Sequence, residues 1–263
     1  MSADRVECVV EDHVAQVRLN RPEKRNGLDL AMFEALAATG ERLASERGVR
    51  AVVLSGNGPA FCAGLDWQAF LALGPEAFKL LERRGGAAGN LAQHVTRVWA
   101  ELPVPVIAAL RGVAFGGGLQ IALGADLRYA HPGTQLSVME MRYGLVPDMG
   151  LSTVLPSLVR DDVARELIFT GRRVGAEEAL KIGLVTRLAD DPVAAATETA
   201  RVIAAQSPRA VRAAKALWNG TRCADLRAAL QREEDAQRTL LGTPEQMEAV
   251  MAAMGQRPAV YED

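Results

Sequence analysis

Residues 105–126 read PVIAALRGVAFGGGLQIALGAD, and this stretch decides the fold. The apolar run 105–110 predicts a strand that is buried on both faces. The glycine-rich segment 112–118 then turns the chain into a helix over LQIALGA. A helix N-terminus has unpaired N–H groups and a partial positive charge, and glycine lets a ligand approach the backbone closely. The stretch predicts either a ligand-binding turn or a turn whose glycines only allow tight packing.

A second glycine-rich loop, AFCAGLD at residues 60–66, follows the apolar strand AVVLSG. It is also expected to open a helix, so two helix N-termini facing one point could hold one developing oxyanion. Nucleotide binding is disfavoured, because neither loop contains the Gly-Lys-Ser/Thr sequence of a phosphate loop or the glycine spacing of a dinucleotide site.

The rest of the chain places these loops in an α/β domain. VECVV and VAQVRL flank the polar turn Glu11-Asp12-His13 and predict a hairpin, while DLRYA and TQLSV predict further strands. Asp29 is expected to cap an amphipathic helix. From about residue 190 the chain is rich in Ala, Glu, Arg and Leu, which predicts helices and no further strand. Strands alternating with helices indicate largely parallel pairing.

Composition excludes several classes of protein. The chain has 263 residues, a formal net charge of −2 and 24% charged residues, which disfavours disorder and a nucleic-acid-coating role. Three scattered cysteines, Cys8, Cys62 and Cys223, form neither a disulfide framework nor a zinc ligand set. No export signal or membrane span is expected, because Arg111 and three glycines interrupt the longest apolar stretch. A cytoplasmic location is the resulting expectation.

Residues 136–150, LSVMEMRYGLVPDMG, supply two candidate acids. Glu140 lies in an apolar run, where a carboxylate either finds a partner or has its pKa raised by desolvation. A raised pKa suits a group that takes and returns a proton near neutral pH. The alternatives are a buried glutamate paired with an arginine, and Asp148 acting as the N-cap of a helix near Gly150.

Taken together, these segments resemble the crotonase superfamily, also called the enoyl-CoA hydratase/isomerase family. The likeness runs from about residue 5 to the mid 250s and rests on five ordered motifs. They are LNRPEKRNGLD, AFCAGLD, GVAFGGGLQIALGADLRYA, LSVMEMRYGLVPDMG and LIFTGRRVGAEEALKIGLVTRL. The resemblance implies a crotonase-like ββα spiral core over residues 1–190. It also implies a C-terminal helical region over 191–263 that covers the site and mediates oligomerisation.

The resemblance also implies a set of site residues. The backbone N–H groups of Leu65 and Gly117 would form an oxyanion hole around a thioester carbonyl, and the charge would be held as an enolate. Carried over by motif position, the residues that would bind the CoA thioester are Arg25, Ala63, Leu65, Asp66 and Gly117.

The sequence departs from the hydratase pattern at Gln120, where hydratases carry a glutamate. Glutamine does not titrate, so it cannot serve as a general acid or base and is left to orient substrate or water. The remaining acids, Glu140 and Asp148, fit proton shuttling better than addition of water, which favours isomerisation of an enoyl- or dienoyl-CoA double bond. A hydratase acting with Glu140 and a weakly active thioester-binding protein remain as alternatives. Dehalogenation is disfavoured, because Gln93 stands where that branch has its basic histidine.

No metal or redox cofactor is expected, and CoA is part of the substrate. His13, His94 and His131 lack ligand spacing, and Cys62 reads as a small buried hydrophobe. Trp67, Trp99 and Trp218 read as packing residues, with Trp67 near the acyl pocket. The RRGGAAGN break at 83–90 is expected to be mobile, and Arg83 and Arg84 either face solvent or touch CoA phosphates. The implied partners are an acyl-CoA thioester and further copies of the chain, as a homotrimer or hexamer, without nucleic acid or membrane.

Overall fold

A six-stranded sheet forms the centre of the computed structural model, which describes residues 4–83, 89–221, 239 and 243–261. The strand order is β1-β2-β3-β4-β6-β9; β1 and β2 pair antiparallel and the other neighbours pair parallel. Asp12 and His13, both at positive φ, make the predicted hairpin turn between β1 and β2. The bounds are β1 (Val6–Glu11), β2 (Val14–Leu19), β3 (Ala51–Gly56), β4 (Val106–Leu110), β6 (Leu127–Ala130) and β9 (Arg187–Leu188).

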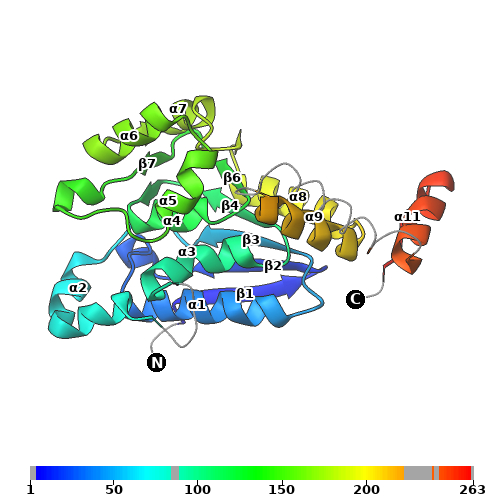
Figure 1. Ribbon diagram of the computed structural model, residues 1–263, viewed down its shortest axis with the longest axis horizontal. Helices are drawn as coiled ribbons and strands as arrows, with labels where there is room; N and C mark the ends of the chain where they lie inside the picture. Colours follow the sequence, from blue (N-terminus) through cyan, green and yellow to red (C-terminus); the bar gives the residue numbers. More distant parts are fainter. Residues whose placement is uncertain (1–3, 84–88, 222–238, 240–242, 262–263) are drawn as a thin grey trace.

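Both faces of this sheet are covered by helices. On one face, Val52 and Leu54 of β3 join the core formed with α1 (Leu30–Ser45) and α3 (Leu91–Glu101), which pack against each other (Figure 1). On the other face, Ala51 and Val53 pack with the small residues of α8 (Pro192–Ala204). The burial of alternate residues on opposite faces explains why this strand is apolar throughout.

A second sheet of three short strands carries the candidate site. It has the order β5-β7-β8, with β5 (Val113–Phe115) parallel to β7 (Gln135–Ser137) and β8 (Val174–Gly175) antiparallel to β7. The other α-helices among the described residues are α2 (Trp67–Leu73), α4 (Gly117–Leu123), α5 (Leu151–Val154), α6 (Asp161–Thr170), α7 (Ala176–Lys181), α9 (Pro208–Thr221) and α11 (Pro244–Met254). Figure 1 shows α11 standing away from the sheets, beyond α8 and α9.

The structure confirms the predicted α/β class and refines it. Asp29 caps α1, because its Oδ1 accepts a hydrogen bond of 2.9 Å from the Met32 amide. β5, β8 and β9 escaped prediction, since their two or three residues do not stand out from the glycine-rich or polar segments around them, whereas the equally short β7 is predicted by TQLSV. Of the RRGGAAGN break, residues 84–88 lie outside the described residues, as does Cys223.

The described C-terminal residues form α8, α9 and α11, but α8 is part of the core that covers the main sheet. The expected boundary near residue 190 stays a prediction. No described helix is both long and apolar enough to cross a membrane.

Candidate active site

The two glycine-rich loops lie against each other. The Cys62 amide donates to the Val113 carbonyl at 3.1 Å, and the Phe115 amide donates to the Cys62 carbonyl at 3.0 Å. Gly64 has φ of +88°, and a Cβ there would stand 2.7 Å from the Phe115 oxygen and 3.7 Å from the Gly117 nitrogen. Only glycine therefore allows the loops to approach this closely.

The backbone around Leu65 and Gly117 leaves the N–H group of each residue without a hydrogen-bond acceptor in its own loop or helix. Leu28 and Leu65 form an isolated parallel bridge, in which the Leu28 amide donates to Gly64 and the Asp66 amide donates to Leu28. In such a bridge the Leu65 N–H points away from Leu28. Gly117 is the first residue of α4, where a helical N–H has no intrahelical partner. Both residues line the same cavity.

This cavity, of about 380 Å³, is mostly apolar and includes Phe33, Phe70 and Met149 among its lining residues. Glu140 and Asp148 contribute the two carboxyl groups among the residues that line it. The structure therefore brings both predicted acids and both predicted amides to one cavity. Trp67, expected near the acyl pocket, also lines it and stacks at 4.7 Å between ring centroids against Tyr143.

Glu140 begins a single 3-10 turn, Glu140–Tyr143, that follows β7. Its Oε1 accepts a 2.6 Å hydrogen bond from Gln120 Nε2, while its Oε2 is buried and has no hydrogen-bond partner. Burial raises the pKa of Glu140. Hydrogen bonding from its own backbone amide and from Gln120 opposes this rise, and the nearby charge of Asp148 adds a smaller increase. The alternative considered from the sequence was an arginine paired with Glu140. The partner in the structure is instead the neutral side-chain amide of Gln120.

Gln120 lies one helical turn beyond Gly117 and is 1% exposed. Its Nε2 donates to Glu140, and its Oε1 accepts a 3.0 Å hydrogen bond from the Met149 amide. Because the backbone amide of Met149 can only donate, it must contact the oxygen of the Gln120 side chain, and the nitrogen of that side chain then faces Glu140. Both ends of the glutamine amide are therefore bonded to protein groups.

Asp148 lies at the wall of the cavity and is exposed on its other side, where it also borders a smaller polar cavity with Arg83. Partial burial raises the pKa of its carboxyl group. Asp148 does not cap a helix, because Gly150, at φ of +92°, occupies the N-cap position of α5.

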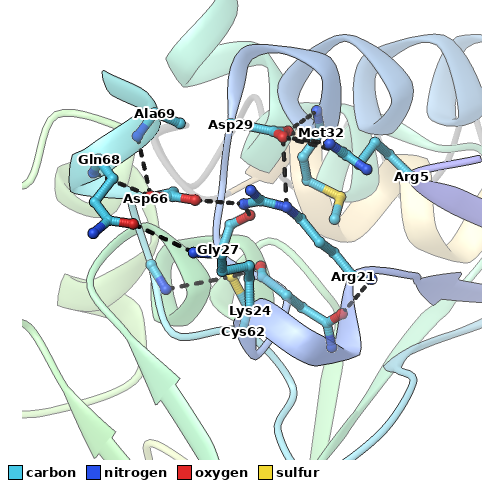
Figure 2. A network of polar contacts seen from close by, with 12 residues as sticks. Arg5, Arg21, Lys24, Gly27, Asp29, Met32, Cys62, Asp66, Gln68 and Ala69 are labelled. Atoms are coloured by element: carbon cyan, nitrogen blue, oxygen red, sulfur yellow. Dashed lines mark hydrogen bonds and ion pairs between the residues drawn. The ribbon is translucent and has the colours of Figure 1, made fainter. Parts of the chain in front are cut away.

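The predicted CoA-binding segment runs beside the first glycine loop. The Ala63 amide donates to the Arg25 carbonyl at 3.0 Å, and the Arg25 residue itself is exposed. The Asp66 carboxylate is occupied: it caps α2 through Gln68 and Ala69 and pairs with Arg21 at 2.7 Å (Figure 2). Sequence reasoning missed Arg21, although it stands within the LNRP motif.

The cysteine, histidine and tryptophan residues considered from the sequence lie in the following surroundings. Cys62 is buried, its Sγ donates to the Asn26 carbonyl, and burial raises the thiol pKa to about 12, so the thiol stays protonated. His94 pairs with Glu41 on the surface, and no cluster of three or more His, Cys, Asp or Glu suited to a metal occurs among the described residues. Trp99 is buried as expected, whereas Trp218 is 73% exposed in the single chain, so the expectation that it is a packing residue stays a prediction.

A comparison with family models decides the classification. The model described as enoyl-CoA hydratase/isomerase matches residues 10–263. The chain belongs to the enoyl-CoA hydratase/isomerase family. The two sheets, the helices that cover them and the paired glycine loops described above are thus those of a crotonase fold.

Relatives with different activities lie within this family. YngF of Bacillus subtilis (strain 168), provisionally named an enoyl-CoA hydratase/isomerase, is 37% identical over 96% of both chains. The mitochondrial Delta(3,5)-Delta(2,4)-dienoyl-CoA isomerase of Mus musculus is 32% identical over 94% of this chain and 78% of its own. The crystal structure of enoyl-CoA hydratase from Bacillus anthracis superposes with a TM-score of 0.89 at 31% identity, covering 98% of both chains. Family membership thus establishes an acyl-CoA-processing enzyme and leaves the reaction open.

Proposed function

We propose that this enzyme isomerises a carbon–carbon double bond of an enoyl- or dienoyl-CoA through a thioester enolate. The observation that carries the proposal is the Glu140–Gln120 pair. One Glu140 oxygen is held by an amide that cannot titrate, and the other is buried without a partner. One titratable group at this point suits moving a proton between two carbons, while two-carboxylate hydration requires a second acid where Gln120 stands.

In the proposed reaction the thioester carbonyl oxygen accepts hydrogen bonds from Leu65 N–H and Gly117 N–H. The Glu140 carboxylate removes a proton from the α or γ carbon, and the C–H electron pair moves into the conjugated system, leaving negative charge on the thioester oxygen. Each well-aimed donor of this kind contributes roughly 3–4 kcal/mol to the transition state. Return of the same proton from Glu140 to the other carbon shifts the double bond and restores the carboxylate. If a protonated Asp148 gives the second proton instead, the proton held by Glu140 has to pass to Asp148 before the next turnover.

Gln120 acts in this scheme on Glu140 rather than on the substrate, because both ends of its amide are bonded to protein groups. Its N–H occupies Oε1 of Glu140, which leaves Oε2 as the carboxylate oxygen without a hydrogen-bond partner. Asp148 serves as a second acid or as an electrostatic partner that keeps the pKa of Glu140 high. The pantetheine of CoA follows Arg25 and Ala63, through backbone atoms.

Hydration is the second candidate, since a hydratase is among the solved structures that resemble this one. Incubation with a 3-enoyl-CoA and with a 2-enoyl-CoA separates the two reactions. Isomerisation predicts a gain of conjugated thioester absorbance from the 3-enoyl substrate; hydration predicts its loss from the 2-enoyl substrate with a 3-hydroxy product. Tight binding of both thioesters without turnover supports the third candidate, a thioester-binding protein.

Assembly as a homotrimer or hexamer is a separate part of the proposal and rests on the family resemblance. Light scattering coupled to size exclusion measures the mass of the particle. A mass of three or six chains is expected, and a monomer at micromolar concentration contradicts it.

A further inference from the structure

The segment around Leu65 is held by an arginine that lies outside the cavity. Arg21 Nη1 donates to Asp66 Oδ2 at 2.7 Å and to the Gly27 carbonyl at 3.0 Å (Figure 2). Asp66 directly follows Leu65, and Gly27 directly precedes Leu28. One guanidinium nitrogen therefore fastens both strands of the Leu28–Leu65 bridge.

Burial makes this contact stronger than a surface ion pair. The side chains of Arg21 and Asp66 are each 11% exposed. Solvent screens such a pair less than an exposed pair, and a charge-assisted hydrogen bond adds to the attraction. Burial by itself raises the pKa of Asp66, yet the amide of Ala69 and the charge of Arg21 bring it below its usual range. The carboxylate is therefore ionised, and Arg21 is its cation.

The same guanidinium also reaches the first helix. Arg21 Nε lies 3.6 Å from Asp29 Oδ2, and Asp29 caps α1 and pairs with Arg5 (Figure 2). Arg21 thus links the caps of α1 and α2, while its own amide donates to the buried Asn26 side chain. Leu65 sits between the cap of α2 and Gly64, so a shift of Asp66 reorients its N–H.

We propose that Arg21 is a positioning residue that aims the Leu65 N–H at the thioester oxygen. The inference rests on the proposed oxyanion role of Leu65 and deepens it. Without the guanidinium, Asp66 keeps its cap on α2 but loses its tie to Gly27. The Leu65 segment is then held to Leu28 only by the two backbone hydrogen bonds of the bridge, which leaves the direction of its N–H less constrained. Removing an oxyanion donor outright costs about 10²–10³-fold in kcat, so misaiming one should cost roughly ten- to a hundredfold.

The test uses dimethylaminocinnamoyl-CoA, a conjugated thioester whose absorption moves to longer wavelength when its carbonyl is polarised. Binding to the wild-type enzyme should produce this shift. Arg21→Met and Asp66→Asn should each reduce it and lower kcat/KM at least tenfold. Asparagine caps helices as well as aspartate does, so Asp66→Asn removes the ion pair and keeps the cap. Arg172→Met, which removes another arginine paired with two carboxylates, should leave the shift unchanged.

The absorption maximum of the bound probe does not depend on the fraction of enzyme that is folded. If Arg21 only stabilised the fold, its substitution would therefore leave this absorption maximum unchanged. A full shift in the two variants overturns the inference while the wild-type shift still supports the oxyanion site. No shift in the wild type overturns the oxyanion site itself. If Arg21→Met fails to fold, Asp66→Asn decides, because a full shift there is equally contradictory.

Discussion

At the scale of single residues, the site depends on how Glu140 is bonded. Its Oε1 is held by Gln120, its Oε2 is buried without a partner, and burial raises its pKa. The carboxylate is therefore less stable in the folded enzyme than in water, which makes it a stronger base at the cost of folding stability.

Glu140→Gln should lower kcat by about 10²–10⁴-fold, because the group that moves the proton is lost. The wild-type rate should fall at acidic pH as Glu140 becomes protonated, at a pH above the usual range of a glutamate because its pKa is raised. Stopped-flow or spectrophotometric rates across pH 5–9 measure both effects, and an unchanged rate in the variant contradicts the assignment.

The same residue predicts a pH dependence of stability. A carboxyl whose folded pKa lies above its unfolded pKa stabilises the fold when protonated, and this contribution is lost as pH rises through the folded pKa. Wild type should therefore lose stability relative to Glu140→Gln as the pH rises from the usual range of a glutamate pKa through the raised pKa of the folded protein. Thermal melting of the two proteins in parallel measures the difference, and a constant difference would argue against the raised pKa.

Gln120→Glu should place a second carboxyl group next to Glu140, whose Oε1 now lies 2.6 Å from Gln120 Nε2. Two carboxylates this close share one proton, so the pKa of the pair rises and the acidic limb of the rate profile moves upward. The ratio of hydration to isomerisation should rise at least tenfold. Product analysis by chromatography measures the ratio, with Gln93→Glu, at the cap of α3, as the control.

At the scale of elements, the site is made where two turns meet. β3 leads into the loop containing Gly64 and α2, and β4 leads through β5 into Gly116 and α4. Backbone hydrogen bonds between Cys62 and the strand β5 lock the two turns together. The helix termini are therefore placed by strand pairing and not by the side chains of the cavity.

Gly64→Ala tests this arrangement. Its φ of +88° is strained for alanine, and the new Cβ would lie 2.7 Å from the Phe115 oxygen, so the loops must separate. We expect a loss of about 1–3 kcal/mol in the free energy of unfolding and at least a tenfold lower kcat/KM. Urea unfolding and initial rates measure these effects. Gly48→Ala, where a Cβ has open space, is the control and should retain full activity.

At the scale of the whole molecule, a buried lysine fastens the helix α9 to the core. Lys215 of α9 is 8% exposed, and its Nζ donates to the carbonyls of Trp99 and Val104 and to Asp126 Oδ2, the last at 2.7 Å. Asp126 in turn accepts from the amide of Val106 at the start of β4. The connection joins α9, α3 and the central sheet.

Lys215→Met should destabilise the protein by roughly 1.5–3 kcal/mol, because it leaves Asp126 and two carbonyls without their charged donor. Urea unfolding measures the loss, and limited proteolysis should cut the C-terminal region faster. Lys181→Met, at the end of α7, is the matched control. Equal stability of the two variants contradicts the role given to Lys215.

The sequence by itself determined the α/β class, the hairpin, the Asp29 cap, both glycine loops and the presence of an acid in an apolar run at Glu140. These features are encoded by residues close together in the sequence, or by the order in which such local patterns follow one another along the chain. Only the tertiary structure decided which Glu140 oxygen is free, that Gln120 binds protein at both ends, and that Arg21 holds Asp66, 45 residues away. Contacts between distant segments depend on how strands pair and helices pack, and no local pattern of residues encodes them.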